Sequence, residues 1–511
     1  MSLLYNIPAF SILLPMLAGV ICLVLPARAS RRVTNTVIVA LAVLSFVLLN
    51  GFLEGATPFT YRMGHYGAPI GNEIRAGELE AAMAALFLVV MMLSLMGGRN
   101  HLRSDIGRSK VNLYYISVLF LLSSMLALSY TNDLFTAYVF VEINTVTACG
   151  IIISKEDGYT LAASMRYLIM SLLGSGLFLI GICLVYGLTG HLLMPNIQDA
   201  VILLVQDGHY QAPLQVTIAL FAVGLALKSA LWPFHSWLAD AHSSASAASS
   251  AILSGLVLKS FIFLMIKIFF RTVGPGLMTG HAILNLLLVF GILGMLLGSV
   301  NALFEKDIKR MLAFSSVSQI GYIFCGVGLG TIAGVSAALV QVVVHAVTKA
   351  MLFIAAGGLM DASGGRKDFK ALQGAGKRDV VAGAAFAVGT MSMIGLPFFA
   401  GFITKLTLVT AAAGTHDWRA YISLGAIVLS TILTAIYYIR VLSLIFGREE
   451  GEEADPEVRS RSALLAHLHK QLSMDTEYIL ASLAFIVINL WIGLRSDDLM
   501  TIINTGLATF Q

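Results

Sequence analysis

Apolar segments of about twenty residues follow one another along nearly the whole chain, with short polar stretches between them. A segment of this length crosses the hydrocarbon core of a bilayer as an α-helix, which satisfies its own backbone hydrogen bonds. The mean hydropathy is +0.86 and only 12% of the 511 residues are charged, too few to cover a soluble fold of this size. We therefore predict an all-α integral membrane protein of about fourteen spans, near 8–26, 33–52, 81–98, 112–130, 134–154, 161–187, 213–232, 248–270, 281–302, 309–329, 332–360, 381–413, 420–446 and 478–495.

The cysteines argue against a metal centre on this chain. Each stands alone in an apolar segment, without CxxC spacing or nearby histidines: Cys22, Cys149, Cys183 and Cys325. Buried small side chains explain them better than a zinc site, an iron–sulfur cluster or a disulfide framework. The spans leave no soluble domain of useful size, so we expect no metal, no other cofactor and no redox or hydrolytic site on this chain.

The loop charges predict the orientation. Most lysines and arginines between the spans fall on one side, which is the cytoplasmic side by the positive-inside rule. With an even number of spans, both termini then face outward from the cell (inner) membrane. The net charge of +4 follows largely from these loops and does not require a nucleic-acid partner. The charged segment 447–477 is predicted to be a solvated cytoplasmic loop that could dock a partner.

A few ionisable residues fall inside the predicted spans, where a charge is tolerated mainly if it faces protein or water. They are Glu142, Arg166, Lys228, Lys259, Lys267, His345, Lys349, Lys405 and Arg440. Lys267 and Arg440 lie near span ends, so we expect them to snorkel to the interface without a functional role. Arg166 is a candidate structural partner of Glu142. The others lie deep in apolar segments and favour a proton or ion pathway over a purely structural network.

The local sequence around these residues supports a pathway. His345 and Lys349 are four residues apart and therefore share a helix face. Proline and glycine interrupt two spans beside lysines: Pro233 follows Lys228, and Gly395, Pro397 and Gly401 precede Lys405. Broken helices at corresponding places in two halves of a chain are typical of transporters, and the freed backbone groups bring water to the site.

Four segments carry a resemblance to a known family: 228–242 (KSALWPFHSWLADAH), 304–321 (FEKDIKRMLAFSSVSQIG), 345–353 (HAVTKAMLF) and 395–405 (GLPFFAGFITK). Together with Ser254, Gly255 and Lys259, they resemble the signature of the proton-conducting, antiporter-like subunits of respiratory complex I, membrane-bound hydrogenases and Mrp-type sodium/proton antiporters. The chain ends soon after the last predicted span, which favours resemblance to the Mrp D-type subunit or its hydrogenase counterparts over the largest complex I member.

The resemblance implies an organisation of the chain. Three helices (1–111) precede two inverted five-helix repeats (112–270 and 281–446), with the seventh and twelfth helices broken. The charged loop 447–477 and the last span with the C-terminus (478–511) follow the repeats.

The resemblance also implies roles for individual residues. The proton pathway would run through Glu142, Lys228, Lys259, His345, Lys349 and Lys405, with supporting roles for Arg166, His235, Asp240 and His242 and helix breaks at Pro233 and Pro397. Arg166 departs from the family, which more often has lysine there; arginine rarely deprotonates, so it can bias Glu142 but carries protons poorly. The segment 77–80 also departs, because relatives usually place an aspartate there.

We therefore expect a proton-translocating subunit of a multisubunit membrane complex, with Na+ as a candidate exchanged cation. Its expected partners are other membrane subunits, with a peripheral redox module as a candidate. One alternative is the proton-pumping subunit of a complex I-like oxidoreductase or of a membrane-bound hydrogenase. Further alternatives are a structural membrane scaffold and a subunit for inorganic-carbon uptake.

Overall fold

The computed structural model describes residues 2–67, 71–107, 110–155, 157–206, 208, 211–274, 282–447 and 476–510. Most of the predicted charged loop 447–477 lies outside these residues. The first half of the described chain contains α1 (Ser2–Cys22), α2 (Ala27–Leu53), β1 (Phe59–Arg62), η1 (Met63–His65), β2 (Glu73–Ala76), α3 (Glu78–Gly97), α4 (Arg99–Asp105), α5 (Val111–Tyr130), α6 (Leu134–Ile153), α7 (Gly158–Thr189), α8 (Met194–Gln206), α9 (Gln211–Lys228) and α10 (Ser236–Ser244).

The second half begins with one long helical segment that includes two π-helical stretches: α11 (Ala247–Ile252), η2 (Leu253–Val257), α12 (Leu258–Ile268) and η3 (Phe269–Val273). It continues with α14 (Ala282–Phe304), α15 (Ile308–Gly328), α16 (Ile332–Asp361), α17 (Ala375–Arg378), α18 (Val380–Ile394), α19 (Ala400–Ala413), α20 (Trp418–Ile445), α22 (Thr476–Leu494) and α23 (Ser496–Ala508).

Thirteen helices of the described residues are long and apolar enough to cross a membrane. Two shorter apolar helices, α18 and α19, together cover the predicted span 381–413. The predicted all-α membrane fold is therefore confirmed, apart from the short antiparallel pair β1–β2, which the hydropathy pattern did not indicate. The division into two inverted repeats stays a prediction.

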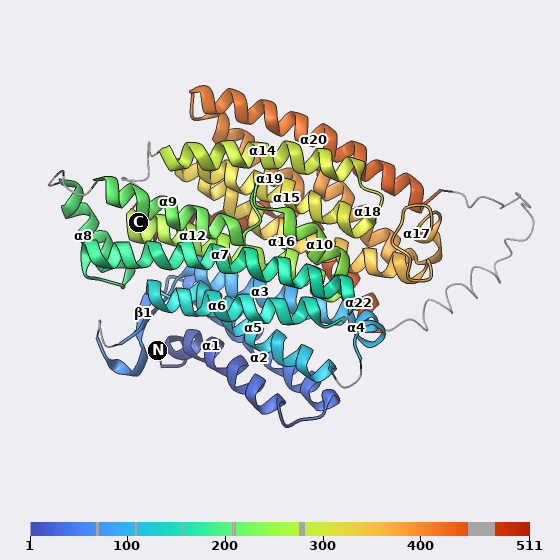
Figure 1. Ribbon diagram of the computed structural model, residues 1–511, viewed down its shortest axis with the longest axis horizontal. Helices are drawn as coiled ribbons and strands as arrows, with labels where there is room; N and C mark the ends of the chain where they lie inside the picture. The colour runs from blue at the N-terminus through green and yellow to red at the C-terminus, as the bar shows by residue number, and fades with distance from the viewer. Residues whose placement is uncertain are drawn as a thin grey trace, which may run out of the picture.

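The long helices run side by side and give the bundle two ends (Figure 1). One end, here called the hairpin end, carries β1, β2 and α8, and both termini are marked there. The opposite end, here called the loop end, carries α4, α10 and α17. An even number of crossings places the termini at one end, as the hydropathy pattern predicts.

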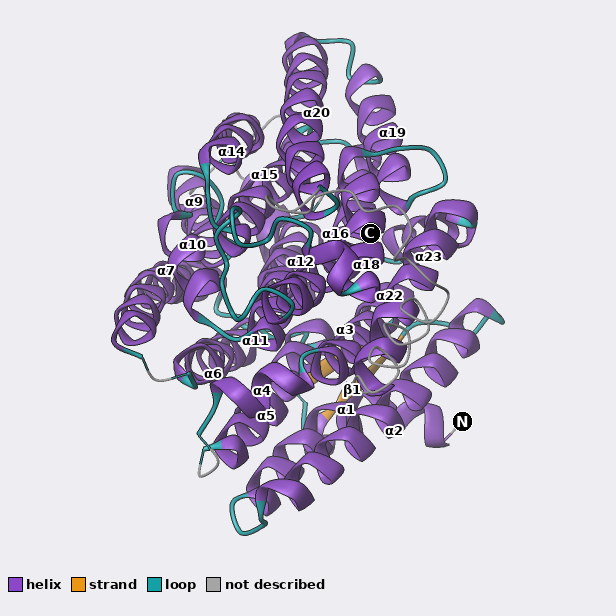
Figure 2. Cartoon of the chain, turned by 90° about the vertical axis from the view of Figure 1, so that its right-hand side faces the viewer, coloured by secondary structure: helices purple, strands orange, loops and turns teal. Residues whose placement is uncertain are grey.

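The centre of the bundle is formed by α12, α15 and α16, whose residues are almost all buried (Figure 2). Close helix approach is made possible by glycine: a Cβ atom on Gly321 of α15 would lie 2.5 Å from the Gly291 carbonyl oxygen of α14. The helices α1, α2 and α20 lie at the periphery and expose apolar side chains such as Val43 and Ile436. The ionisable residues in the middle of these central helices are consequently enclosed by protein: Lys259, Lys267, His345 and Lys349.

Candidate functional site

Lys228 is the last residue of α9, where the seventh predicted span is interrupted. Its side chain is 1% exposed, and its Nζ donates a hydrogen bond to the Thr145 hydroxyl of α6 at 2.6 Å. Glu142 lies one turn before Thr145 on α6 and is half-buried, and its charge interacts with that of Lys228 without a direct ion-pair contact. The break in the helix thus presents the lysine to a hydroxyl and a nearby carboxylate.

Lys259 lies at the centre of the bundle on α12 and is fully buried. The preceding π-helical stretch η2 is wider than an α-helix, and the Lys259 Nζ donates to the Ser254 carbonyl within it. The Ser254 hydroxyl lies 2.9 Å from the Ser316 hydroxyl of α15. Lys259 therefore folds back along its own helix, beside a polar contact to α15.

His345 and Lys349 occupy one face of α16 and are both buried, as their spacing predicts. The Lys349 Nζ donates to the Leu312 carbonyl at 2.9 Å, and the charges of Lys259, His345 and Lys349 interact with one another. Neither ring nitrogen of His345 has a hydrogen-bond partner among the described residues. The structure thus brings the central three predicted residues together.

Lys405 on α19 lies across the second helix break. Its Nζ donates to the Ile394 carbonyl at 2.5 Å and to the Thr431 hydroxyl at 3.0 Å. Ile394 is the last residue of α18, and a terminal helical carbonyl lacks an intrahelical partner. Gly395 follows with φ +87°, a left-handed conformation that favours glycine. The helix break therefore leaves the Ile394 carbonyl oxygen free to accept the hydrogen bond from Lys405.

Polar residues of α20 that the sequence motifs did not indicate also contact the lysines. Thr431 contacts Lys405, and the Tyr438 hydroxyl accepts from Lys349 at 3.2 Å and lies 3.0 Å from the Ser315 hydroxyl. Thr431, Thr434 and Tyr438 are spaced by three and four residues and so share one face of an otherwise apolar helix. That spacing is the signal that could have identified them.

Arg166 does not pair with Glu142. The arginine side chain is 67% exposed and bonds the Asp240 carboxylate at 2.5 Å, at the loop end. Asp240 also accepts from Arg310 at 2.8 Å and from the Tyr159 hydroxyl at 3.1 Å. Asp240 of α10 faces α7 at the loop end, and it therefore holds Arg166 at the surface.

The two histidines of the 228–242 segment lie in different surroundings. His235 precedes α10 and is half-buried beside the Phe314 ring, with centroids 6.2 Å apart. His242 is fully buried, stacks on Phe353 at 4.6 Å, and interacts with the charges of Lys259 and Lys349. His242 thus adjoins the central lysines, and His235 is farther out.

Lys267 does not snorkel to the interface. It is fully buried, and its Nζ donates to the carbonyls of Ser129 and of Thr131, the latter at 2.9 Å. Arg440 behaves differently, because it donates to the carbonyls of Leu303 and Glu305, both at 2.8 Å, at an exposed position where α14 ends. The prediction of a side chain at the interface therefore agrees with the exposed position of Arg440 and is wrong for Lys267.

Glu142, Lys228, Lys259, His345, Lys349 and Lys405 are here called the charged row. Viewed along the helices, α9, α12, α16 and α19 follow one another across the bundle, so the row runs transversely (Figure 2). Its four lysines donate to neutral hydroxyl and carbonyl oxygens. No ion pair of the described residues includes any of these lysines. Gain or loss of a proton consequently breaks no ion pair, which suits a group that changes its protonation state.

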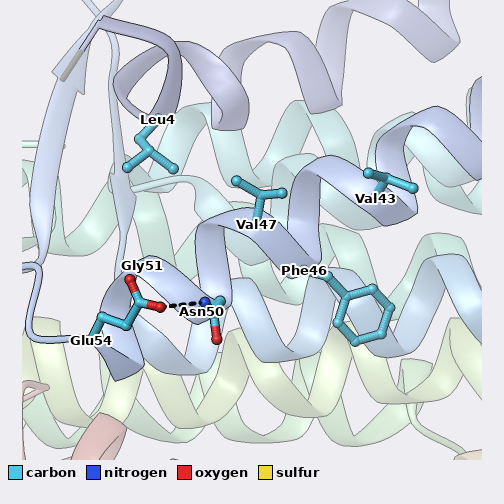
Figure 3. Close-up of a pocket in the computed structure, with 7 residues that line it drawn as sticks. All are labelled: Leu4, Val43, Phe46, Val47, Asn50, Gly51 and Glu54. Carbon is cyan, nitrogen blue, oxygen red and sulfur yellow. Dashed lines mark hydrogen bonds between the residues drawn. The ribbon is translucent and has the colours of Figure 1, made fainter.

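One surface groove lies apart from the charged row. A groove of about 650 Å³ lies on α1 and α2 (Figure 3), where the Asn50 amide donates to the Glu54 carboxylate at 2.7 Å. It is lined mostly by apolar side chains and by no residue of the charged row. Among the described residues, no group of three or more histidine, cysteine, aspartate or glutamate side chains could hold a metal ion.

The fold and the buried row of lysines define a polytopic membrane protein with ionisable groups enclosed at its centre. The family described as "NADH:quinone oxidoreductase/Mrp antiporter, TM" matches residues 131–434, which include the entire charged row. The chain belongs to this family, as its sequence motifs indicate.

Individual relatives agree with this assignment. The chain is 31% identical to "NADH-quinone oxidoreductase subunit N" of Desulforudis audaxviator (strain MP104C), over 86% of each chain. It is 28% identical to "Putative antiporter subunit mnhD2" of Staphylococcus haemolyticus (strain JCSC1435), over 91% of each.

Two solved structures share the fold. A chain of the Mrp complex from Dietzia sp. DQ12-45-1b matches with a TM-score of 0.85 at 24% identity, covering 100% of this chain and 98% of that one. A chain of the archaeal membrane-bound sulfane sulfur reductase matches with a TM-score of 0.83 at 24% identity, covering 99% and 98%.

Proposed function

We propose that this chain is a proton-translocating subunit of a multisubunit membrane complex and that protons move along the charged row. The observation that carries the proposal is the bonding of the buried Lys228, Lys259 and Lys349, and of the half-buried Lys405, to neutral oxygens. A hydroxyl such as that of Thr145 can donate or accept, so it serves a protonated or a neutral lysine equally. Glu142 supplies the one carboxylate of the row, beside Lys228.

The proposed mechanism is a series of local proton transfers. When Glu142 and Lys228 attract one another, the charge on Lys228 is stabilised, and a proton on Lys259 is repelled less than when Lys228 is charged alone. His345 interacts with the charges of both Lys259 and Lys349. Both of its ring nitrogens are without a hydrogen-bond partner among the described residues, so they are available to receive and pass a proton. Lys405, near Thr431, ends the row on the far side of the bundle.

Orientation and partners complete the proposal. The basic loops support a cytoplasmic position of the loop end, with both termini outside, in the cell membrane. The relatives are named as subunits, which supports assembly with other membrane chains. One relative is named as a putative antiporter subunit, which supports exchange of protons for a cation, with Na+ as the candidate.

A redox-driven pump is the second candidate. Its support is the 31% identity to a protein named as a subunit of an NADH-quinone oxidoreductase. Purification of the native complex separates the two candidates, since hydrogenase or flavin subunits would accompany a redox pump and small membrane subunits an antiporter.

Two substitutions test the proposal, Lys228→Ala and Glu142→Ala, in the complete complex in membrane vesicles. Coupled ion transport, followed with a pH-sensitive dye, is expected to be lost while the partner subunits still copurify. Lys306→Ala is the matched control, because Lys306 is exposed at the loop end. Normal transport in an assembled Lys228→Ala complex would refute the proposal, and loss of assembly without a transport defect in the assembled fraction would favour the scaffold.

A further inference from the structure

A second group of buried charges lies at the hairpin end, outside the charged row. Its core is Glu80 of α3, Arg75 of β2 and Lys267 of α12, whose side chains are all buried. Arg75 pairs with Glu80, with 2.6 Å between Nη1 and Oε1, and donates to the Thr509 carbonyl at 2.7 Å. The ion pair joins β2 to the start of α3 and, through Thr509, to the end of α23, in the 77–80 segment for which the family resemblance gave no role.

Lys267 and Glu80 interact through their charges, but Lys267 itself is held by two backbone carbonyls at the end of α5. Arg75 is consequently the direct ionic partner of Glu80. An arginine remains charged at any physiological pH, whereas lysine and glutamate can exchange a proton. Arg75, together with Arg271 of η3, thus acts as a fixed charge beside Glu80 and Lys267.

Two buried oxygens in this group lack a partner among the described residues. They are the second carboxylate oxygen of Glu80 and the Tyr130 hydroxyl, and both residues are fully buried. The charge of Glu80 also acts on Tyr130. Buried polar atoms normally have a hydrogen-bond partner, and a bound proton on the carboxylate or a shared water satisfies them. The free oxygen of Glu80 therefore has a proton or a water as its possible partner.

Polar groups continue from Glu80 toward the surface of the hairpin end. Glu73 lies two residues before Arg75 on β2, and the Asn132 amide donates to its carboxylate at 2.7 Å. The other oxygen of Glu73 lies 3.7 Å from the Arg62 guanidinium, whose side chain is 63% exposed. The group thus extends from a fully buried lysine to a solvent-exposed arginine.

Helix α12 joins this group to the charged row, because it carries both Lys259 and Lys267. Lys267 follows Lys259 by eight residues on α12, which is about 12 Å along a helix axis. We propose that Glu80 and Lys267 form a proton-exchange site that connects the centre of the charged row to the hairpin face. This inference rests on the proposed function.

The transfer is a simple proton exchange. The Lys267 ammonium gives a proton to the Glu80 carboxylate through a water shared with Tyr130, and leaves a neutral amine and a carboxylic acid. The acid releases its proton to solvent at the hairpin end, and the amine receives the next proton from the charged row. Arg75 stays charged throughout and stabilises the returning carboxylate.

Substitution of Glu80 in the complete complex provides the first test. In Glu80→Gln, coupled proton transport is expected to fall at least tenfold, and Glu80→Asp, which keeps a carboxyl group, is expected to recover part of it. Glu78→Gln is the matched control, because Glu78 is also buried at the start of α3 but bonds the Thr509 hydroxyl. Its transport is expected to stay within twofold of wild type.

Carbodiimide labelling provides a second test that requires no variant. Dicyclohexylcarbodiimide modifies protonated carboxyl groups in apolar surroundings, so peptide mapping of the wild-type complex is expected to find modified Glu80, with less modification as the pH at the hairpin face rises. Normal transport in Glu80→Gln, or absence of Glu80 labelling at every pH, would overturn the inference. If Lys228→Ala abolishes transport while Glu80→Gln does not, this inference fails and the proposed function stands. If Lys228→Ala transports normally, the proposed function fails, and the labelling still decides whether Glu80 binds a proton.

Discussion

The Lys349 ammonium donates a hydrogen bond to the Tyr438 hydroxyl, with 3.2 Å between the nitrogen and oxygen atoms. Tyr438 belongs to α20, a peripheral helix whose other residues include exposed apolar side chains. The same helix supplies Thr431 to Lys405. One helix thus contacts two lysines of the charged row, which makes it a structural link between the centre of the row and its far end.

Removal of the Tyr438 hydroxyl is expected to slow transport. Tyr438→Phe leaves Lys349 with the Leu312 carbonyl and removes the one bonding partner that can both donate and accept. We expect coupled transport in vesicles to fall about tenfold, equivalent to about 1.4 kcal/mol of barrier. Tyr421→Phe on the same helix is the control, because Tyr421 is 77% exposed. Equal rates in the two variants would contradict a role for Tyr438.

The Thr431 hydroxyl is expected to matter for Lys405. Thr431→Val keeps the side-chain shape but removes one of two partners of a largely buried ammonium, a loss of about 1.5–3 kcal/mol for a hydrogen bond to a charged group. Reduced transport and a lower unfolding temperature of the complex should follow. Thr410→Val, at an exposed position of α19, should change neither. An unchanged Thr431→Val complex would show that the Ile394 carbonyl alone suffices.

Arg166 is expected to be dispensable for transport. Its side chain is mostly exposed and pairs with Asp240, so Arg166→Ala should reduce stability by less than about 1 kcal/mol and leave transport near wild type. Transport assays of Arg166→Ala and Lys228→Ala side by side provide the measurement. A loss as large as that in Lys228→Ala would mean that Arg166 acts on Glu142 after all.

The second helix break depends on Gly401. A Cβ atom there would lie 1.7 Å from the Ser392 carbonyl oxygen, which cannot be relieved without moving α18 from α19. We expect Gly401→Ala to destabilise the protein by about 1–3 kcal/mol and to lower the yield of assembled complex. Gly425→Ala is the control, because a Cβ atom on Gly425 meets no atom within 4 Å. Equal thermal stability of the two variants would refute the close packing.

Hydropathy was sufficient to predict the helical membrane fold, because the bilayer leaves few alternatives for a chain with so many apolar segments. It could not predict the strands β1 and β2, whose four-residue lengths carry little periodic signal. The break in 381–413 was foreseeable from Gly395 and Pro397, since proline lacks a backbone N–H donor and glycine readily adopts the left-handed conformation that ends a helix.

Side-chain partners were harder to predict than positions. The spacing of His345 and Lys349 fixed their common face, but nothing in the sequence indicated that Arg166 would bind Asp240, 74 residues later. Lys267 was predicted to reach the membrane interface because few residues separate it from the end of its predicted span. Its burial depends on packing against α5, which a single sequence does not reveal.

Proton flux through a complex that carries Lys259→Met tests the central claim most directly. Lys259 is fully buried and interacts with both His345 and Lys349, so a methionine of similar size removes the ionisable group with little change in packing. With the complex reconstituted in liposomes and flux followed by internal pH, we predict loss of coupled proton movement in an assembled, folded complex. Wild-type flux through Lys259→Met would contradict the pathway.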